Sequence, residues 1–588
     1  MRNGFFSDDE VVGRFYDARL IKRLLGYVGR YAALAVLALV LVLTGMGLFL
    51  VNPWLLGRIV DLGIRGRDAD MLVKLGCLYG AVELLIFVVT YAHNYLLQVI
   101  GQRVMYDLRA EFFSHLQRMP LPFFDRNPVG RLVTRVTNDI ATLAELFSSG
   151  IVMVIGDLVL IIGIAATLIG LQPTLGLATL STVPLLAVAA WFFQTRIRMA
   201  FREVRTRIAR VNAALSENLS GIRVIQIFTQ EARRARRFDE LNASHRDAQL
   251  DSVFYHSLFT PTVTIINAVC IVVVLLLGGH MHQTGALSLG LLVSFLTYAQ
   301  NFFHPIRNIS EKVTIFQSAM ASAERVFALL DEPEESGCRE GAALGEVRGE
   351  IVFDRVSFSY TGTHEVLHEI SFTVAPGQSV AIVGHTGAGK TTITALLNRM
   401  YEVTRGRILL DGRDLRDIAK FDLRRRIAVI HQDVFLFADT VLENIRLWDP
   451  AVPPERVEQI AREIGADPFI RALPHGYRTE LQERGANLST GQRQLISFAR
   501  ALCADPAILV LDEATSSIDS ESEKIIQEAI KTLTRGRTCL IIAHRLSTIR
   551  HCDRILVLHQ GHLVESGTHD ELLARRSFYH KLYELQFL

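Results

Sequence analysis

The sequence lacks paired cysteines and any marked excess of charge of one sign. None of its six cysteines forms a CxxC spacing, so neither a zinc site nor a disulfide framework is indicated. These cysteines are Cys77, Cys270, Cys338, Cys503, Cys539 and Cys552. The formal net charge of +2 over 588 residues gives no reason to expect a nucleic acid partner. Residues 2–30 are amphipathic and contain no cleavage-like site, so we predict a helix at the membrane surface rather than a signal peptide.

What the sequence has in excess is long apolar runs. Half of its residues are hydrophobic, and the excess lies almost entirely before about residue 330. Residues 31–57 carry no charge, which is long enough for a helix that crosses roughly 30 Å of hydrocarbon. Further apolar runs follow at about 75–100, 147–170, 175–193, 254–279 and 287–305. The sequence therefore predicts six membrane-spanning helices.

The loops between these runs differ in length and charge. Two stretches of about 50 residues, after the second and the fourth run, are helical in pattern and rich in arginine, whereas the other loops are short. By the positive-inside rule the long loops and both termini are cytoplasmic, although Arg58, Arg65 and Arg67 lie on the opposite side. We expect the long loops to extend the membrane helices as protruding hairpins. Solvated basic faces are the alternative.

Two carboxylates, Glu83 and Asp157, fall inside predicted spans. Ionisable side chains are costly in hydrocarbon and usually face a cavity. One interpretation is a substrate pathway, perhaps one that favours cations. The other is an interhelical hydrogen bond or a position near the membrane interface, and the sequence leaves both open.

A phosphate-binding motif follows the drop in hydropathy around residues 331–349. Residues 379–383 form a buried-strand run, and a helical segment extends to Met400. Between them the chain fits GxxxxGK[ST], whose backbone N–H groups wrap phosphates at a helix N-terminus. Lys390 is expected to neutralise the β- and γ-phosphates and Thr391 to ligate Mg²⁺. The predicted binding residues here are Gly384, His385, Thr386, Gly387, Ala388, Gly389, Lys390, Thr391 and Thr392.

Acidic residues follow a second buried strand at 507–511. Asp512 is placed to hold Mg²⁺ through water, and Glu513 to polarise the attacking water as general base. A third strand, 538–543, ends in His544, whose imidazole can contact the γ-phosphate.

The segment 488–492, Leu-Ser-Thr-Gly-Gln, precedes another helix. Ser489 is a good N-cap residue. Its hydroxyl, Gly491 and the positive helix end also make an anion site. The two interpretations are compatible.

In this order the motifs resemble the ATPase domain of ABC transporters over roughly residues 350–588. The resemblance implies that Tyr360 stacks on adenine and that Gln432 links Mg²⁺ to the membrane domain as part of the catalytic set with Glu513 and His544. It also implies that Ser489, Gly491 and Gln492 contact ATP, that residues 516–519 are exchanged across a dimer, and that residues 480–485 touch the partner's coupling helix.

The membrane half resembles ABC exporters as well. Residues 123–130, continuing to 139, are similar to their first intracellular loop, residues 217–229 to the second, and residues 321–325 to the exit from the sixth helix. The resemblance implies a half-transporter. Its expected parts are an all-α six-helix transmembrane domain with long cytoplasmic extensions (1–328), a linker (329–349) and an α/β P-loop ATPase domain (350–588).

The resemblance further implies ATP and Mg²⁺ as cofactors and a multi-pass protein of the bacterial cytoplasmic (inner) membrane. The expected function is ATP-driven export of a hydrophobic or amphipathic drug or lipid by alternating access. A homodimeric lipid flippase and an ATP-gated channel are the alternatives. Thr490 stands where family signatures usually carry glycine, while Glu513, Lys390, Gln432 and His544 are all present. In this combination the chain resembles the subunit of heterodimeric bacterial multidrug ABC exporters that keeps the catalytic glutamate. The resemblance therefore implies a heterodimer rather than a homodimer.

Overall fold

The computed structural model describes residues 17–337, 341–342, 344–512, 520–542 and 549–587. The chain divides into two compact units. The first comprises Met1–Gln117 and Val129–Glu332, and the second comprises Arg118–Pro128 and Pro333–Leu588. The short segment Arg118–Pro128 therefore groups with the second unit, although the chain on both sides of it belongs to the first.

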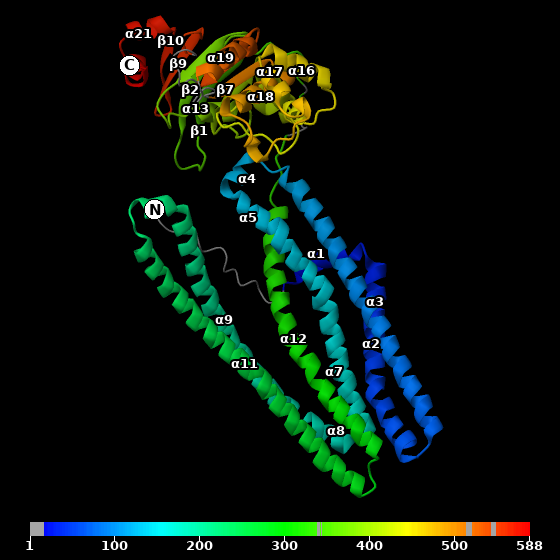
Figure 1. The fold of residues 1–588 in the computed structure, drawn as a ribbon. Coiled ribbons are helices and arrows are strands. Elements are labelled where there is room, and N and C mark those ends of the chain that lie inside the picture. The colour runs from blue at the N-terminus through cyan, green and yellow to red at the C-terminus, as the bar shows by residue number, and fades with distance from the viewer. Residues whose placement is uncertain (1–16, 338–340, 343, 513–519, 543–548, 588) are drawn as a thin grey trace. The chain divides into compact units, whose positions relative to one another are not determined.

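The first unit is helical (Figure 1). Its long helices are α2 (Ala32–Arg58), α3 (Ala69–Leu116), α7 (Ile151–Leu171), α9 (Val183–Ser220), α11 (Glu231–Gln283) and α12 (Leu289–Leu330). The shorter ones are α1 (Ala18–Gly29), η1 (Ile59–Arg65), α5 (Val129–Thr134), η2 (Arg135–Asp139), α6 (Ile140–Glu145), η3 (Leu146–Gly150), α8 (Pro173–Leu180) and α10 (Ile222–Ile227).

Among the described residues, five helical runs are long and apolar enough to cross a membrane. They are Ala32–Arg65, Ala69–Leu116, Val129–Leu171, Pro173–Ser220 and Glu231–Gln283. The sixth predicted span lies at the start of α12, where the apolar stretch Leu289–Phe303 is shorter than the other five. The expected helical extensions are confirmed, since α3, α9 and α11 continue without a break well beyond their apolar runs.

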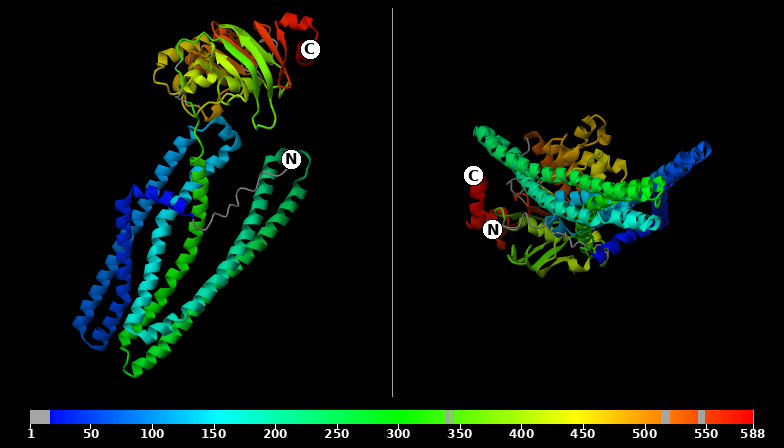
Figure 2. Two further views of the ribbon diagram at one scale, coloured as in Figure 1. Left: turned by 180° about the vertical axis from the view of Figure 1, so that it is seen from behind. Right: turned by 90° about the horizontal axis from the view of Figure 1, so that it is seen from below.

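Two pairs of long helices lie side by side within this unit. Helix α2 packs on α3 and α9 packs on α11, as both views show (Figures 1 and 2). A core of apolar side chains from α7, α11 and α12 joins them, and Ile164, Val274 and Phe295 are fully buried in it. Farther along α12, Arg325 donates to the Asp139 carboxylate at 2.6 Å. This ion pair ties α12 to η2, which lies next to α6.

The second unit contains two sheets within the described residues. An antiparallel sheet has the order β2 (Leu367–Val374), β1 (Ile351–Phe358), β4 (Arg405–Leu410), β5 (Arg413–Asp414). The other has the order β10 (His562–Gly567), β9 (Arg554–His559), β3 (Ser379–Val383), β8 (Thr538–Ile542), β7 (Ile508–Asp512), β6 (Ile427–Ile430). In the second sheet, β9, β3, β8, β7 and β6 are parallel, and β10 is antiparallel to β9.

The parallel strands are buried on both faces, which explains their almost continuous apolar sequence. In β7, Leu509 and Leu511 enter one hydrophobic core, and Ile508 and Val510 enter the other. The helices of this unit are α4 (Leu121–Arg126), α13 (Lys390–Leu397), α14 (Lys420–Arg426), α15 (Val441–Arg446), α16 (Pro454–Glu463), α17 (Asp467–Ala472), α18 (Thr490–Cys503), α19 (Ser520–Thr534), α21 (His569–Ala574) and α22 (Phe578–Phe587). Figure 1 shows α16, α17 and α18 grouped to one side of the sheets.

The linker is anchored on this unit by Glu335. Its carboxylate accepts from Arg424 at 2.7 Å and from Lys420 at 3.2 Å, and the Glu335 and Lys420 side chains are 12% and 8% exposed. Burial raises the pKa of the Glu335 carboxyl, but Arg424 and Lys420 together hold it below its usual value. Removing the charge of such a poorly exposed, paired carboxylate costs free energy of folding, because its basic partners then lack a counter-charge.

We therefore expect Glu335→Gln to lower the free energy of unfolding of the second unit by about 2 kcal/mol, since Lys420 would lose part of its compensation. Because the folded pKa is depressed, the stabilisation is complete above the ordinary value of 4.5 and disappears as the pH falls through the lower folded value. Thermal unfolding of the two proteins across this pH range measures the difference. Glu334→Gln is the matched control, since its ion pair with Arg118 is exposed and should contribute little. Equal melting temperatures for the wild type and Glu335→Gln at pH 7 would contradict the assignment.

Candidate functional site

Several of the predicted site residues lie where the parallel strands end. The loop 384–389 follows β3, Asp512 is the last residue of β7, and Gln432 comes two residues after β6. In the sheet β6 pairs with β7, and β8 lies between β7 and β3, so Asp512 is two strand spacings, about 10 Å, from the strand that precedes the loop. Ligands of parallel α/β sheets bind at this carboxyl edge.

The loop after β3 depends on glycine at two close approaches. A Cβ atom on Gly384 would lie 2.3 Å from the carbonyl oxygen of Leu558. Gly389 has a φ of +98° as N-cap of α13, and a Cβ there would lie 2.5 Å from Leu367. By contrast, a Cβ on Gly387 would meet nothing within 4 Å. The loop thus holds a tight backbone turn on the sheet and opens outward at its centre, which suits a phosphate cradle.

Lys390 is the first residue of α13 and is 7% exposed. Its ammonium group donates to the carbonyl oxygens of Gly384, at 2.6 Å, and His385, at 3.2 Å. The ammonium group therefore lies against the first two residues of the loop. The next residue, Thr391, is exposed, whereas Thr392 is buried, so only the Thr391 hydroxyl is accessible to a metal ion at this helix start.

Tyr360 lies beside this helix. Its hydroxyl is 3.1 Å from Oγ1 of Thr392, and its ring packs edge-on against Phe358, at the end of β1. The ring remains 49% exposed. A flat aromatic face near a phosphate loop can stack on a base.

The acidic and amide groups occupy the same sheet edge. Asp512 is half-buried and Gln432 is exposed, and both residues have interactions within the molecule. The predicted residues Glu513 and His544, and the segment 516–519, lie outside the described residues.

Helix α18 begins with a complete capping box. The Ser489 hydroxyl accepts from the Gln492 backbone N–H at 3.2 Å, and the Gln492 side chain accepts from the Ser489 N–H at 3.0 Å. The capping role expected of Ser489 is therefore confirmed. Gly491 is buried, while the Thr490 hydroxyl is exposed and accepts from Arg493 at 3.1 Å. Threonine at this position thus has a hydrogen-bond partner within its own helix.

Two residues that the sequence did not single out, Arg500 and Asn444, hydrogen-bond the backbone of the segment 435–444 beside α18. Arg500 of α18 donates to the carbonyl oxygens of Asn444, at 2.9 Å, and Phe435, at 3.1 Å. Burial lowers the pKa of its guanidinium, but arginine stays charged. Asn444 is fully buried and bonds the backbone of Phe437 in both directions. Helical periodicity assigns Arg500 only to a core-facing position, so its hydrogen bonds could not be predicted.

A tyrosine also connects Tyr360 with helix α4. The rings of Tyr360 and Tyr401 meet edge-on with centroids 5.0 Å apart. The Tyr401 hydroxyl donates to the carboxylate of Asp125, on α4. Burial, and then this interaction with Asp125, raise the pKa of Tyr401. The expected adenine-stacking residue is therefore two contacts away from the first predicted intracellular loop, and no local sequence signal marks Tyr401.

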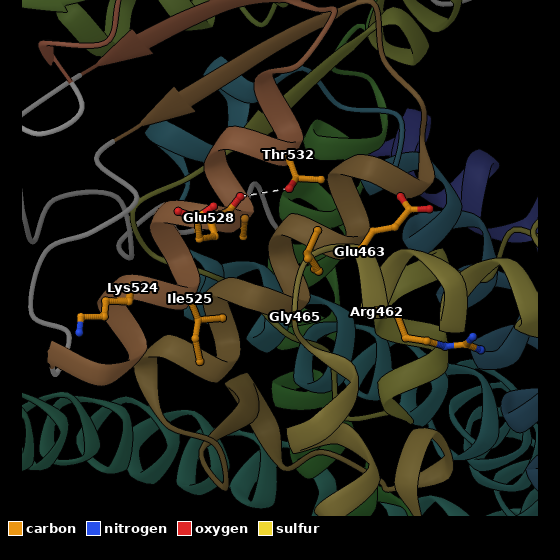
Figure 3. Close-up of a pocket in the computed structure, with 9 residues that line it drawn as sticks. Arg462, Glu463, Gly465, Lys524, Ile525, Glu528 and Thr532 are labelled. Atoms are coloured by element: carbon orange, nitrogen blue, oxygen red, sulfur yellow. Dashed lines mark hydrogen bonds between the residues drawn. The ribbon is translucent and has the colours of Figure 1, made fainter.

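A pocket of about 370 Å³ lies elsewhere in this unit, between α16 and α19. Figure 3 shows Arg462, Glu463, Lys524 and Glu528 around it, with Ile525 beside Gly465. None of the predicted nucleotide-binding residues lines this pocket. Its rim of mixed charge is typical of a solvated surface, and it adds nothing to the site at the sheet edge.

The residues present at that edge fit a nucleoside triphosphate with Mg²⁺. The open glycine loop and helix start suit phosphate oxygens, Lys390 supplies a cation, and Thr391 and Asp512 supply the oxygen ligands that Mg²⁺ prefers. Fold and site together thus define a class of protein, a multi-pass membrane protein joined to a P-loop nucleotide-binding unit.

Comparison with known proteins agrees with this class. Residues 34–306 match the family model described as the ABC transporter transmembrane region, and residues 367–516 match the one described as ABC transporter. An uncharacterized ABC transporter ATP-binding protein of Bacillus subtilis, YknV, is 40% identical over 99% of this chain and 97% of its own length. A probable multidrug resistance ABC transporter ATP-binding/permease protein of the same organism, YheH, is 37% identical over 88% of this chain and 77% of its own length. An ATP-dependent lipid A-core flippase of Syntrophus aciditrophicus is 35% identical over 97% and 94% of the two chains.

The chain belongs to the ABC transporter family, with the transmembrane region and the ATPase domain on one polypeptide. It is an ATPase whose hydrolysis is coupled to transport across a membrane.

Proposed function

We propose that this chain is one subunit of a dimeric exporter that moves a hydrophobic or amphipathic drug or lipid across the bacterial cytoplasmic membrane by alternating access. The observation that carries the proposal is the fusion of a P-loop unit, with Lys390 at the start of α13, to helices that extend far beyond their apolar spans. Such extensions can transmit movement of the ATPase unit to the membrane. Relatives named for multidrug resistance and for lipid A-core flipping support this substrate range.

The division of labour in the site follows from its chemistry. Lys390 neutralises the phosphates, Thr391, Gln432 and Asp512 hold Mg²⁺, and Tyr360 stacks on adenine. Glu513 acts as general base and His544 contacts the γ-phosphate. Ser489, Gly491 and Gln492 complete a site on the other subunit. We propose domain limits of 1–328, 329–349 and 350–588, with both termini in the cytoplasm.

Uphill transport is the direct test of the function. Inside-out vesicles that contain the transporter should accumulate fluorescent drugs or labelled lipid above the outside concentration only when ATP and Mg²⁺ are supplied. An ATP-gated channel would let the probe equilibrate but not accumulate. Equilibration without accumulation across a panel of drugs and lipids would therefore overturn the exporter.

The partner is proposed to be a different half-transporter. Thr490 adds a β-branched side chain at the exposed start of α18, where glycine would let phosphate and backbone approach more closely. This chain's own P-loop face is complete in sequence. We propose that the partner has glycine at the position equivalent to Thr490 and lacks the catalytic glutamate. The phosphate-binding face of this chain and the partner's segment equivalent to 488–492 would then form one active site.

Expression of this chain alone tests the pairing. We expect weak ATPase activity from the isolated chain, and we expect Thr490→Gly to raise it by about tenfold, which corresponds to about 1.4 kcal/mol in the barrier. Turnover in lipid nanodiscs and the oligomeric state by light scattering are the measurements. A stable homodimer with robust ATPase activity and transport, unchanged by Thr490→Gly, would refute the heterodimer and favour a homodimeric flippase.

A further inference from the structure

The two carboxylates within the predicted spans have different surroundings. Asp157 is 8% exposed, whereas Glu83, on α3, is exposed. Glu83 accepts from the side-chain amide of Asn52, on α2, at 2.5 Å. The interhelical hydrogen bond expected as one alternative is therefore present, but the Asn52 amide is neutral and supplies no counter-charge.

Glu83 also lies far along α3 from any other charged residue of that helix. The nearest charged residues along α3 are Lys74 and Arg103, about 14 Å and about 30 Å away at 1.5 Å per residue. Within the part of the chain that the structure describes, no basic side chain forms an ion pair with Glu83. The next basic residue along α2, Arg58, lies over the Trp54 ring instead, 5.2 Å from its centroid.

Three aromatic residues continue from Glu83 along the same ridge of α3, each four residues from the last. Phe87, Tyr91 and Tyr95 are 67%, 65% and 60% exposed. The Tyr91 and Tyr95 rings are stacked, with centroids 6.2 Å apart and planes within 11°. We call Glu83, Phe87, Tyr91 and Tyr95 the α3 ridge.

The chemistry of the α3 ridge selects its occupant. Aromatic faces attract cations, most strongly where water is excluded, and a carboxylate in hydrocarbon needs a counter-charge. Acyl chains or an apolar helix would cover the rings but leave Glu83 buried without compensation, at a high free-energy cost. A molecule that carries a positive charge together with aromatic or alkyl groups would compensate the Glu83 carboxylate and also cover the aromatic rings.

We propose that the α3 ridge is a binding site for lipophilic cations, with Glu83 as counter-charge and Phe87, Tyr91 and Tyr95 as the aromatic surface. Only the claim that these cations are transported rests on the proposed export function. Their binding to the α3 ridge can be measured without transport. Cations entering from the membrane are thereby the substrate class assigned to this transporter.

Equilibrium binding of tetraphenylphosphonium to the full-length protein in lipid nanodiscs is the test. This cation cannot lose its charge, and the neutral probe triphenylphosphine oxide carries similar phenyl groups. We expect Glu83→Gln to weaken binding of the cation about tenfold and binding of the neutral probe little. The double variant Tyr91→Leu/Tyr95→Leu, which keeps apolar area but removes the rings, should also weaken the cation selectively.

Two controls match these changes. Asp70→Asn removes an exposed carboxylate of the same helix that is already paired with Lys74, and Trp191→Leu removes a 71% exposed ring on α9. Neither should alter cation binding. Binding of the cation with unchanged affinity to Glu83→Gln, or no binding to the wild type, would overturn the site. Equal loss of both probes, or loss of subunit assembly in the variants, would show a structural role and overturn it as well. Selective binding of the cation without its ATP-driven accumulation would keep the site but reject lipophilic cations as the transported class, whereas the exporter itself is tested by the panel of drugs and lipids.

Discussion

Glu513→Gln is expected to slow ATP turnover by roughly two to four orders of magnitude, the range attributed to general base catalysis. In sequence the residue directly follows Asp512, the last residue of β7, and we assign it the role of general base on the pattern of an acidic pair after a buried strand. An amide has the shape of the carboxylate but cannot take a proton from the attacking water. Because the change leaves Lys390 and the loop intact, ATP binding should persist.

The measurement is single-turnover hydrolysis together with nucleotide binding, with the partner's site silenced if the partner is active. Glu528→Gln is the matched control, because Glu528 lies on the exposed face of α19 in an ion pair with Lys531. Turnover close to normal at this chain's own site would show that Glu513 is not the base.

Lys390→Ala is expected to weaken ATP binding by about 100-fold, because truncating one member of a buried charge pair costs about 3 kcal/mol. Lys390 is 7% exposed, and its ammonium group donates to the carbonyl oxygens of both Gly384 and His385. Without it the phosphates would keep only backbone N–H groups and the helix end as partners. Loss of binding distinguishes this variant from Glu513→Gln.

Titration of a fluorescent ATP analogue into the purified variants gives the affinities. Lys531→Ala removes an exposed lysine of the same unit and should bind ATP as the wild type does. Unchanged affinity in Lys390→Ala, with the fold intact by circular dichroism, would reject the P-loop assignment for this chain.

The sequence by itself determined the elements whose signal is local. The buried strands β3, β7 and β8, the loop at 384–389 and the N-cap at Ser489 are set by short patterns of apolar, glycine and capping residues. The apolar runs likewise set the membrane helices. The end of the fifth span was less well defined. The fifth apolar run ends at about residue 279, but α11 continues to Gln283. Gly278 and Gly279 are poor helix formers, so local propensity does not predict this extension.

Only the tertiary structure decided which side chains meet across long sequence separations. Tyr401 and Asp125 are 276 residues apart, and Glu335 reaches Arg424 over 89. Likewise, hydropathy treats Glu83 and Asp157 alike, yet packing buries one and leaves the other on an exposed aromatic ridge. The physical reason is that periodicity reports which face of an element is apolar. Which face of another element packs against it depends on the fold as a whole.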